Sequence, residues 1–129
     1  MVKRVVQLKN TRFQGSPFTE LIVYDWFTRN GVQFDYQVPI AGGRQTKLGQ
    51  VLDFAVYSGG SAMALPVQGQ YWHTKPDVAA SDELDKLAAM GQYVNGFRID
   101  RYVPIWENRL YKDRNMVLSY ALANVPLGP

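Results

Sequence analysis

The stretch that decides the fold runs from residue 51 to residue 67 and reads VLDFAVYSGGSAMALPV. It predicts two mostly apolar strands, residues 51–57 and 63–67, joined by a glycine turn over residues 57–61. Strands that are apolar on both faces are typical of the centre of a sheet whose two faces are covered. We therefore expect both strands to lie centrally in a small sheet with helices on its faces.

Length and composition indicate one soluble globular domain. The chain has 129 residues, of which 47% are hydrophobic, and a chain of this length buries enough surface to fold around a single core. No apolar stretch approaches the ~20 residues that cross a bilayer, and the N-terminus lacks the apolar run of a signal peptide. We expect no membrane partner and an intracellular, cytoplasmic location, with a viral or a host-cell setting both open.

Cysteine and histidine usage restricts the possible metal sites. The chain has no cysteine and one histidine, His73, which excludes disulfides, zinc fingers, thiol nucleophiles and two-histidine metal sites. Any metal ion is therefore expected to be a hard cation with oxygen ligands, either Mg²⁺ or Mn²⁺.

The two ends of the chain differ in character from the middle. The net charge is +3, and the arm over residues 1–16 carries Lys3, Arg4, Lys9 and Arg12 before the first acid, Glu20. A basic arm is typical both of a solvated surface and of nucleic-acid contact, and residues 5–8 fit either an edge strand or part of this arm. The arm and the tail over residues 124–129 are also candidates for contacts in a homo-oligomer.

Local signals predict the elements before the central strands. Ser16 as N-cap and Pro17 at the first helical position predict a helix that ends at Asn30-Gly31. Its expected buried stripe is Phe18, Ile22 and Trp26. Alternation over residues 32–38 predicts a strand, and residues 40–49 form a glycine-rich, basic loop.

Three further elements follow the central strands. Residues 77–92 have a helical pattern in which Ala80, Leu84, Leu87, Ala88 and Gly91 are expected to face inward and Asp82, Glu83, Asp85 and Lys86 outward. Residues 97–103 predict a strand and residues 107–123 a final helix. The predicted fold class is an α/β single-domain sandwich over residues 17–123, with a small mixed central sheet flanked by helices.

Asp53 is the residue that stands out in this pattern, because burying an uncompensated carboxylate inside an apolar strand costs several kcal/mol. Two interpretations are open. Asp53 lies at a strand end, where it reaches solvent or accepts backbone hydrogen bonds, or it belongs to a functional site. A basic glycine loop before it and the polar turn Gln68-Gly69-Gln70 on the adjacent strand favour the second.

These segments together resemble the PD-(D/E)XK nuclease superfamily, and within it the branch of very-short-patch mismatch-repair endonucleases. The resemblance covers about residues 17 to 110. It rests on a helix with Glu20, the strand with Asp53, the block Val67-Gln68-Gly69-Gln70-Tyr71-Trp72-His73, a following helix, and Val103-Pro104-Ile105-Trp106-Glu107 after the next strand. It implies a restriction-endonuclease-like sandwich.

The resemblance also implies a catalytic site. The superfamily usually places glutamate and lysine where this chain has Pro66 and Gln68, whereas members of the mismatch-repair branch use a backbone carbonyl as metal ligand. By this resemblance Asp53 and the Val67 carbonyl hold Mg²⁺ or Mn²⁺. His73 is the general base or a phosphate contact, and Gln68 and Glu20 orient water.

The implied partner is double-stranded DNA. Its expected phosphate contacts are Arg44 and Lys47 of the glycine loop, Lys75, and Lys3 and Arg4 of the arm. The leading hypothesis is a metal-dependent endonuclease that hydrolyses phosphodiester bonds. The alternative is an inactive nuclease-fold module that acts in DNA binding or in viral or structural assembly.

Overall fold

The fold is described from a computed structural model that covers residues 4–5, 17–43, 49–69 and 76–128. The chain divides into two compact units, residues 1–33 and 34–129. Each unit is described by itself. Together the described residues contain four helices and a five-stranded mixed sheet, so the expected mixed α/β class is confirmed at this level. None of the helices in these ranges is long and apolar enough to span a bilayer.

Helix α2, Phe18–Arg29, is the main element of the first unit. Pro17 has extended backbone and occupies the N-cap position, and its carbonyl accepts a hydrogen bond from the N–H of Leu21 at 3.2 Å. The helix therefore begins one residue later than expected, and Ser16 lies outside the described residues. Ile22 and Trp26 of the predicted stripe are buried, and Phe18 is half-buried.

A buried carboxylate on α2 was not anticipated from the sequence. Asp25 is 2% exposed, and its Oδ1 lies 3.3 Å from Nε of Arg4. Arg29, one turn later, places Nη1 at 3.9 Å from Oδ2. Arg4 and Val5 have helical geometry, so of the two alternatives for residues 5–8 the edge strand does not hold at Val5; residues 6–8 lie outside the described part of the chain. The two guanidinium groups compensate a charge that would otherwise be costly to bury.

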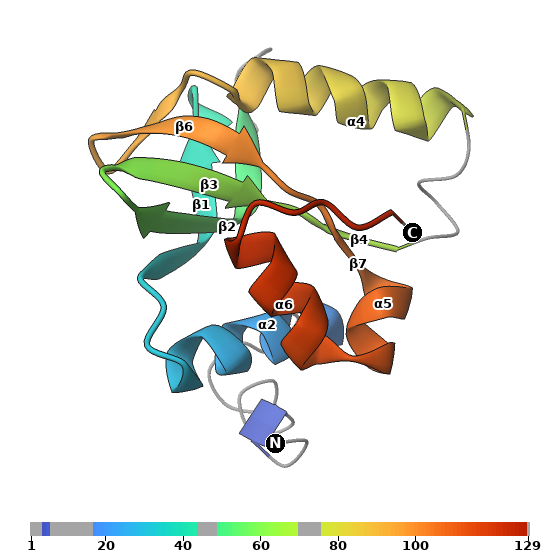
Figure 1. The fold of residues 1–129 in the computed structure, drawn as a ribbon. Coiled ribbons are helices and arrows are strands. Elements are labelled where there is room, and N and C mark those ends of the chain that lie inside the picture. Colours follow the sequence, from blue (N-terminus) through green and yellow to red (C-terminus); the bar gives the residue numbers. More distant parts are fainter. Residues whose placement is uncertain (1–3, 6–16, 44–48, 70–75, 129) are drawn as a thin grey trace. The chain divides into compact units, whose positions relative to one another are not determined.

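The sheet of the second unit has the order β1-β2-β3-β6-β5 (Figure 1). Its strands are β1 (Phe34–Ile40), β2 (Gln50–Ser58), β3 (Ser61–Leu65), β5 (Tyr93–Val94) and β6 (Phe97–Tyr102). Neighbouring strands are antiparallel except for β3 and β6, which are parallel. The apolar runs quoted first thus supply β2 and β3, in the middle of the sheet as predicted.

The strand expected over residues 63–67 is interrupted at Pro66. After this residue the chain leaves the sheet and forms β4 (Val67–Gln68), which pairs in parallel with β7 (Ile105–Trp106). The N–H of Ile105 donates to the Pro66 carbonyl at 2.7 Å. Proline has no N–H to continue the first sheet, and so the second, two-stranded sheet begins there.

Two tight turns set the hairpins. Gly59 and Gly60 have φ of 63° and 82° between β2 and β3, and Asn95 and Gly96 have φ of 50° and 82° between β5 and β6. Positive φ at both central residues is the type I′ geometry that matches strand twist. Strand β5 was not predicted, because the helix expected over residues 77–92 was extended up to the residue before it.

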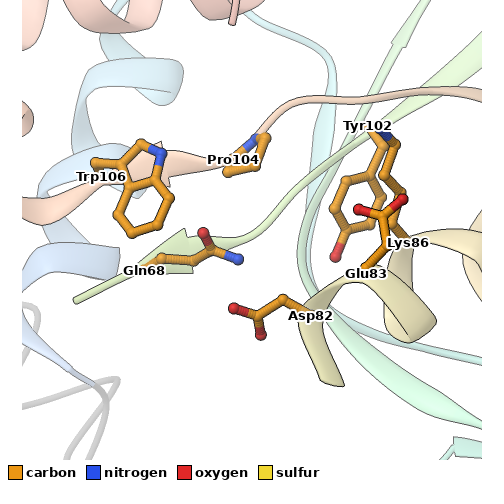
Figure 2. A pocket seen from close by; sticks show the side chains of 7 residues that line it. All are labelled: Gln68, Asp82, Glu83, Lys86, Tyr102, Pro104 and Trp106. Carbon is orange, nitrogen blue, oxygen red and sulfur yellow. The ribbon is translucent and has the colours of Figure 1, made fainter. Parts of the chain in front are cut away.

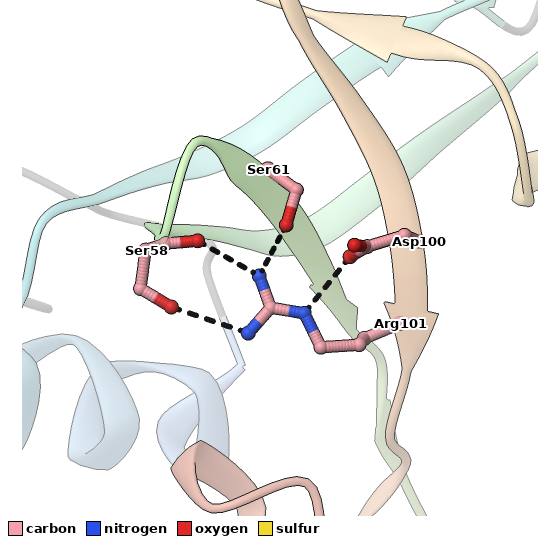
Figure 3. Close-up of polar contacts among 4 residues, drawn as sticks. All are labelled: Ser58, Ser61, Asp100 and Arg101. Carbon is pink, nitrogen blue, oxygen red and sulfur yellow. Dashed lines mark hydrogen bonds and ion pairs between the residues drawn. The ribbon is translucent and has the colours of Figure 1, made fainter.

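Arg101 of β6 forms hydrogen bonds to the turn between β2 and β3, as Figure 3 shows. Its Nη1 donates to Oγ of Ser58 at 3.1 Å, and its Nη2 donates to the carbonyl of Ser58 at 3.2 Å and to Oγ of Ser61 at 2.9 Å. Its Nε donates to Asp100 at 2.9 Å. Hydrogen bonds from Arg101 and Ser61 lower the pKa of Asp100. Arg101 therefore stabilises the turn and is not simply an exposed basic residue.

The two edges of the five-stranded sheet meet, because β1 contacts β5. Tyr57 donates from its hydroxyl to Oδ2 of Asp35 at 2.6 Å, and Nδ2 of Asn95 donates to the same carboxylate and to the Tyr57 hydroxyl at 3.0 Å. Burial and the hydrogen bond to Asp35 raise the pKa of Tyr57 to about 12. The polar triad of Asp35, Tyr57 and Asn95 thus joins strands at opposite ends of the sheet order.

Three helices belong to the second unit: α4 (Pro76–Ala89), α5 (Glu107–Lys112) and α6 (Arg114–Leu122). The single final helix expected over residues 107–123 is wrong, because it is divided at Asp113. The side chain of Asp113 accepts from the N–H of Met116 at 3.0 Å and caps α6, as aspartate commonly does at helix starts. The C-terminal tail folds back, since Nε of Arg109 donates to the Gly128 carbonyl at 2.7 Å.

Helix α4 is rotated relative to the sequence prediction. Leu84 and Leu87, expected to face inward, are 66% and 64% exposed, whereas Asp82 and Lys86 are half-buried. The helix meets the sheet through Ala89, which is fully buried in a core cluster with Ile40, Leu52, Ala55, Ala62, Ala64, Val94 and Ile99. The small residues in this cluster allow the helix end to approach closely, which leaves the leucines outside. Glu83 and Asp85 are exposed, as expected from the sequence.

Candidate functional site

Asp53 lies in the middle of β2 and is half-buried. Its Oδ2 accepts a hydrogen bond of 2.8 Å from the backbone N–H of Val67 on β4. The two residues named together as metal ligands are therefore neighbours. Of the first interpretation of Asp53, the accepted backbone hydrogen bond is observed, but the position at a strand end is wrong.

A cavity of about 160 Å³ opens beside Asp53. Strand β2 and the β3–β4 junction form one side, and Tyr102 of β6 and the acidic face of α4 form another. Its lining residues are Gln50, Val51, Leu52, Asp53, Pro66, Val67, Gln68, Asp82, Asp85 and Tyr102. Helix α4 is held over the cavity by a hydrogen bond of 2.9 Å from Nε2 of Gln50 to the Asp85 carbonyl.

The cavity is electrostatically negative. Burial raises the pKa of Tyr102, and the charges of Asp85, Asp82, Asp53 and Glu83 raise it further. Burial and the neighbouring Asp82 also raise the pKa of Asp85. Like charges within one pocket disfavour ionisation of each other, so this space favours a cationic occupant.

Gln68 lines both this cavity and a second cavity of about 230 Å³ (Figure 2). It is 5% exposed. The second cavity is lined by Gln68, Asp82, Glu83, Lys86, Tyr102, Pro104 and Trp106. In Figure 2 the side chain of Gln68 points into this space, with Trp106 and Asp82 on either side of it and Tyr102 opposite.

The described carboxylates do not form a complete metal site by themselves. Within residues 4–5, 17–43, 49–69 and 76–128, no group of three or more histidine, cysteine, aspartate or glutamate side chains is arranged to hold a metal ion. Asp53 supplies one ligand of the oxygen type that Mg²⁺ prefers, and the group of Val67 that contacts it is the backbone N–H, a hydrogen-bond donor.

Several residues predicted to act at the site cannot be assigned to it. His73, Arg44, Lys47, Lys75 and Lys3 lie outside the described residues. Glu20 lies on α2 in the first unit and is half-buried. Arg4, expected to contact DNA, forms the ion pair with Asp25.

Sequence reasoning missed the contribution of α4. Asp82, assigned to the solvent face, is half-buried, and Asp85, exposed as predicted, also lines the cavity. Both share a helix face with the buried Ala89, at positions i, i+3 and i+7. This spacing places the three on one side of a helix. The sequence signal for this face was an acidic stripe that continues into an alanine. The two leucines on another face are more hydrophobic and favoured the wrong orientation of the helix.

Comparison of the chain with protein-family models, with curated proteins and with solved structures found no match.

Proposed function

We propose that this chain is a metal-dependent endonuclease-like protein that hydrolyses phosphodiester bonds in double-stranded DNA, with Asp53 at its centre. The observation that carries the proposal is the contact of Asp53 with Val67 at the mouth of an acidic cavity. The hydrogen bond fixes the carboxylate and brings the backbone of β4 beside it. The proposed reaction also requires the carbonyl of Val67 as a metal ligand.

The charge of the cavity supports a requirement for a divalent cation. A phosphodiester is an anion, and Asp53, Asp82 and Asp85 repel it unless a cation intervenes. Asp53 and the Val67 carbonyl are the groups that would hold Mg²⁺ or Mn²⁺, which supplies Lewis-acid polarisation of the phosphate and a more acidic water. Gln68 would orient that water through its amide, since it cannot accept the proton.

The order of elements also supports the proposal. In chain order, a helix and three antiparallel strands are followed by the two-residue strand β4, a helix, the two-residue strand β5, and a strand parallel to the third. This is the order on which the resemblance to the PD-(D/E)XK superfamily rests. The restriction-endonuclease-like fold and the DNA partner are part of the proposal.

A second candidate function keeps the fold without the chemistry. Gln68, at the position of the usual lysine, is neutral and buried, and the described carboxylates include no three-ligand group. Both observations favour a nuclease-fold module that binds DNA or takes part in assembly.

The discriminating experiment is a cleavage assay on plasmid and on mismatched or branched duplexes with Mg²⁺ or Mn²⁺, for the wild type, Asp53→Ala and the control Asp100→Asn, which removes an exposed acid elsewhere. We expect nicking that is lost on chelation and in Asp53→Ala, and retained in Asp100→Asn. Full activity of Asp53→Ala, or cleavage without metal, contradicts the proposal.

Calorimetric titration with Mn²⁺ separates the two candidates. Binding that Asp53→Asn abolishes supports the nuclease. No Mn²⁺ binding, together with salt-dependent DNA binding by the wild type, supports the non-catalytic module, because phosphate contacts make affinity fall steeply with salt.

A further inference from the structure

The cavity of about 230 Å³ shares Gln68 and Asp82 with the cavity of the proposed hydrolysis, and its walls combine three kinds of group. Trp106, Tyr102 and Pro104 are flat or apolar, Asp82 and Glu83 are acidic, and Gln68 is a buried amide. The volume is below the ~300–1,000 Å³ typical of sites for drug-sized ligands. The cavity therefore suits one small polar group on an apolar stem.

Gln68 is the observation that indicates a ligand. The residue is 5% exposed, and its side chain points into the cavity (Figure 2). No hydrogen bond joins its amide to another residue in the part of the chain that the structure describes. The amide is not among the described side-chain groups that are enclosed without a hydrogen-bond partner, so it opens onto the cavity, where an occupant can donate to its oxygen.

The charges of the cavity determine the sign of that occupant. Asp82 and Glu83 outnumber Lys86, and Asp53 and Asp85 lie in the adjoining cavity. The pKa of Tyr102 is raised partly by these same carboxylates, so their negative field reaches the wall shared by the two cavities. A cation is favoured over a neutral or an anionic group.

The shape of the walls selects among cations. A guanidinium is planar, is weakly hydrated, stacks on aromatic faces and donates several hydrogen bonds in one plane. It is suited to a tryptophan ring on one side, a carboxylate and an amide oxygen at the edge, and a second aromatic ring opposite. An ammonium is more strongly hydrated and cannot stack in this way.

We propose that the cavity formed by Gln68, Asp82, Tyr102 and Trp106 binds a guanidinium group, stacked on Trp106 and donating to the Asp82 carboxylate and the Gln68 amide oxygen. The group is supplied either by a free guanidino compound or by an arginine side chain of a polypeptide. This inference does not depend on the proposed nuclease activity.

The test is ligand-observed NMR with full-length protein and three probes: ethylguanidinium, ethylammonium, and N-ethylurea, which has a similar shape without the charge. We expect ethylguanidinium to bind with a Kd on the order of 1–10 mM, a reasonable range for so few atoms. Both other probes should bind at least about tenfold more weakly, the cost of losing a charge-assisted contact. Equal binding of N-ethylurea or ethylammonium overturns the proposal.

Variants locate the site. Asp82→Asn and Gln68→Leu should each weaken ethylguanidinium binding about five- to tenfold, whereas Lys86→Met should strengthen it by removing a like charge. Trp106→Phe should abolish the change in tryptophan fluorescence on binding, and Asp100→Asn should leave affinity unchanged. Thermal unfolding by circular dichroism checks that each variant is folded. Weaker binding by Lys86→Met, or unchanged binding by Asp82→Asn, contradicts the assignment.

A last comparison identifies the source of the group. Tighter binding of a Gly-Arg-Gly amide than of ethylguanidinium supports the proposal with a polypeptide partner. Similar binding of the two supports it with a free guanidino compound.

Discussion

The backbone N–H of Val67 donates to Oδ2 of Asp53 across a distance of 2.8 Å. This bond connects β2 with β4, two strands that belong to different sheets. It lies just after Pro66, where the chain leaves the first sheet. Asp53 therefore has a structural role in addition to its proposed chemical one, and substitutions can separate the two.

Asp53→Ala and Asp53→Asn should differ in stability. Alanine leaves the half-buried N–H of Val67 without its acceptor, which costs about 1–3 kcal/mol of the free energy of unfolding. Asparagine keeps an oxygen at the same place, so we expect a loss of about 1 kcal/mol or less. Urea unfolding measures both. Equal destabilisation of the two variants would show that the hydrogen bond does not anchor β4. Both variants should lose metal-dependent cleavage, whatever their stability.

Arg101→Lys should destabilise the protein by about 1–3 kcal/mol, because an ammonium cannot reproduce the forked contacts to Ser58 and Ser61. The matched control is Arg98→Lys on the same strand, where the side chain is exposed and the expected change is within about 0.5 kcal/mol. Chemical denaturation measures the two variants in parallel. Similar stabilities for them would contradict the role assigned to Arg101.

Arg4→Met should cost about 1–2 kcal/mol, less than the ~3–5 kcal/mol typical of a fully buried pair because Arg4 is largely exposed. The double variant Arg4→Met/Asp25→Asn should recover part of this loss, since the buried charge is then absent. Thermal unfolding of the single and double variants completes a double-mutant cycle. Additive losses would show that the two side chains do not interact.

Tyr57 should make the protein sensitive to alkali. Its pKa is about 12 in the folded protein and near 10 in the unfolded chain, so the folded state holds the proton more tightly. Stability is then unaffected below pH 10 and falls as the pH rises from 10 to 12. We expect a smaller fall in Tyr57→Phe, measured by urea unfolding across this range. An identical pH dependence in both proteins would contradict the raised pKa.

The rotation of α4 is tested by its leucines. Leu84→Gln and Leu87→Gln should each change stability by no more than about 0.5 kcal/mol, because both side chains are exposed. Ala89→Leu should cost about 1–3 kcal/mol by overpacking the cluster beneath the helix. Differential scanning calorimetry compares the three. A larger loss at Leu84 than at Ala89 would favour the orientation expected from the sequence.

The central strands could be predicted from the sequence because their apolar runs and the turn between them are local signals. Gly59 and Gly60 adopt the conformation that their position requires. The pair Asn95-Gly96 carries an equally strong hairpin signal, yet β5 was missed because the expected helix was extended to residue 92. The last helix was predicted as continuous because its apolar pattern persists across Asp113. The break is visible only in the structure, where the side chain of Asp113 caps α6.

The candidate site was only partly predictable. Asp53 is conspicuous within an apolar strand, and its proximity to Val67 follows from adjacent strands. The contribution of Asp82 and Asp85 depends on which face of α4 meets the sheet. The orientation of the helix is determined by tertiary packing, because the close packing of Ala89 outweighs the hydrophobicity of Leu84 and Leu87.

The contact between β1 and β5 also bears on how the protein avoids aggregation. An unpaired strand edge is a template for strands of other molecules, and β1 is the longest strand at an edge of this sheet. Asn95 is bonded to Asp35 at one end of β1, Gln37 has a φ of 54° that disrupts a flat edge, and Pro39 offers no N–H. The bent sheet therefore leaves little continuous edge on which an intermolecular strand, and so a fibril, can begin.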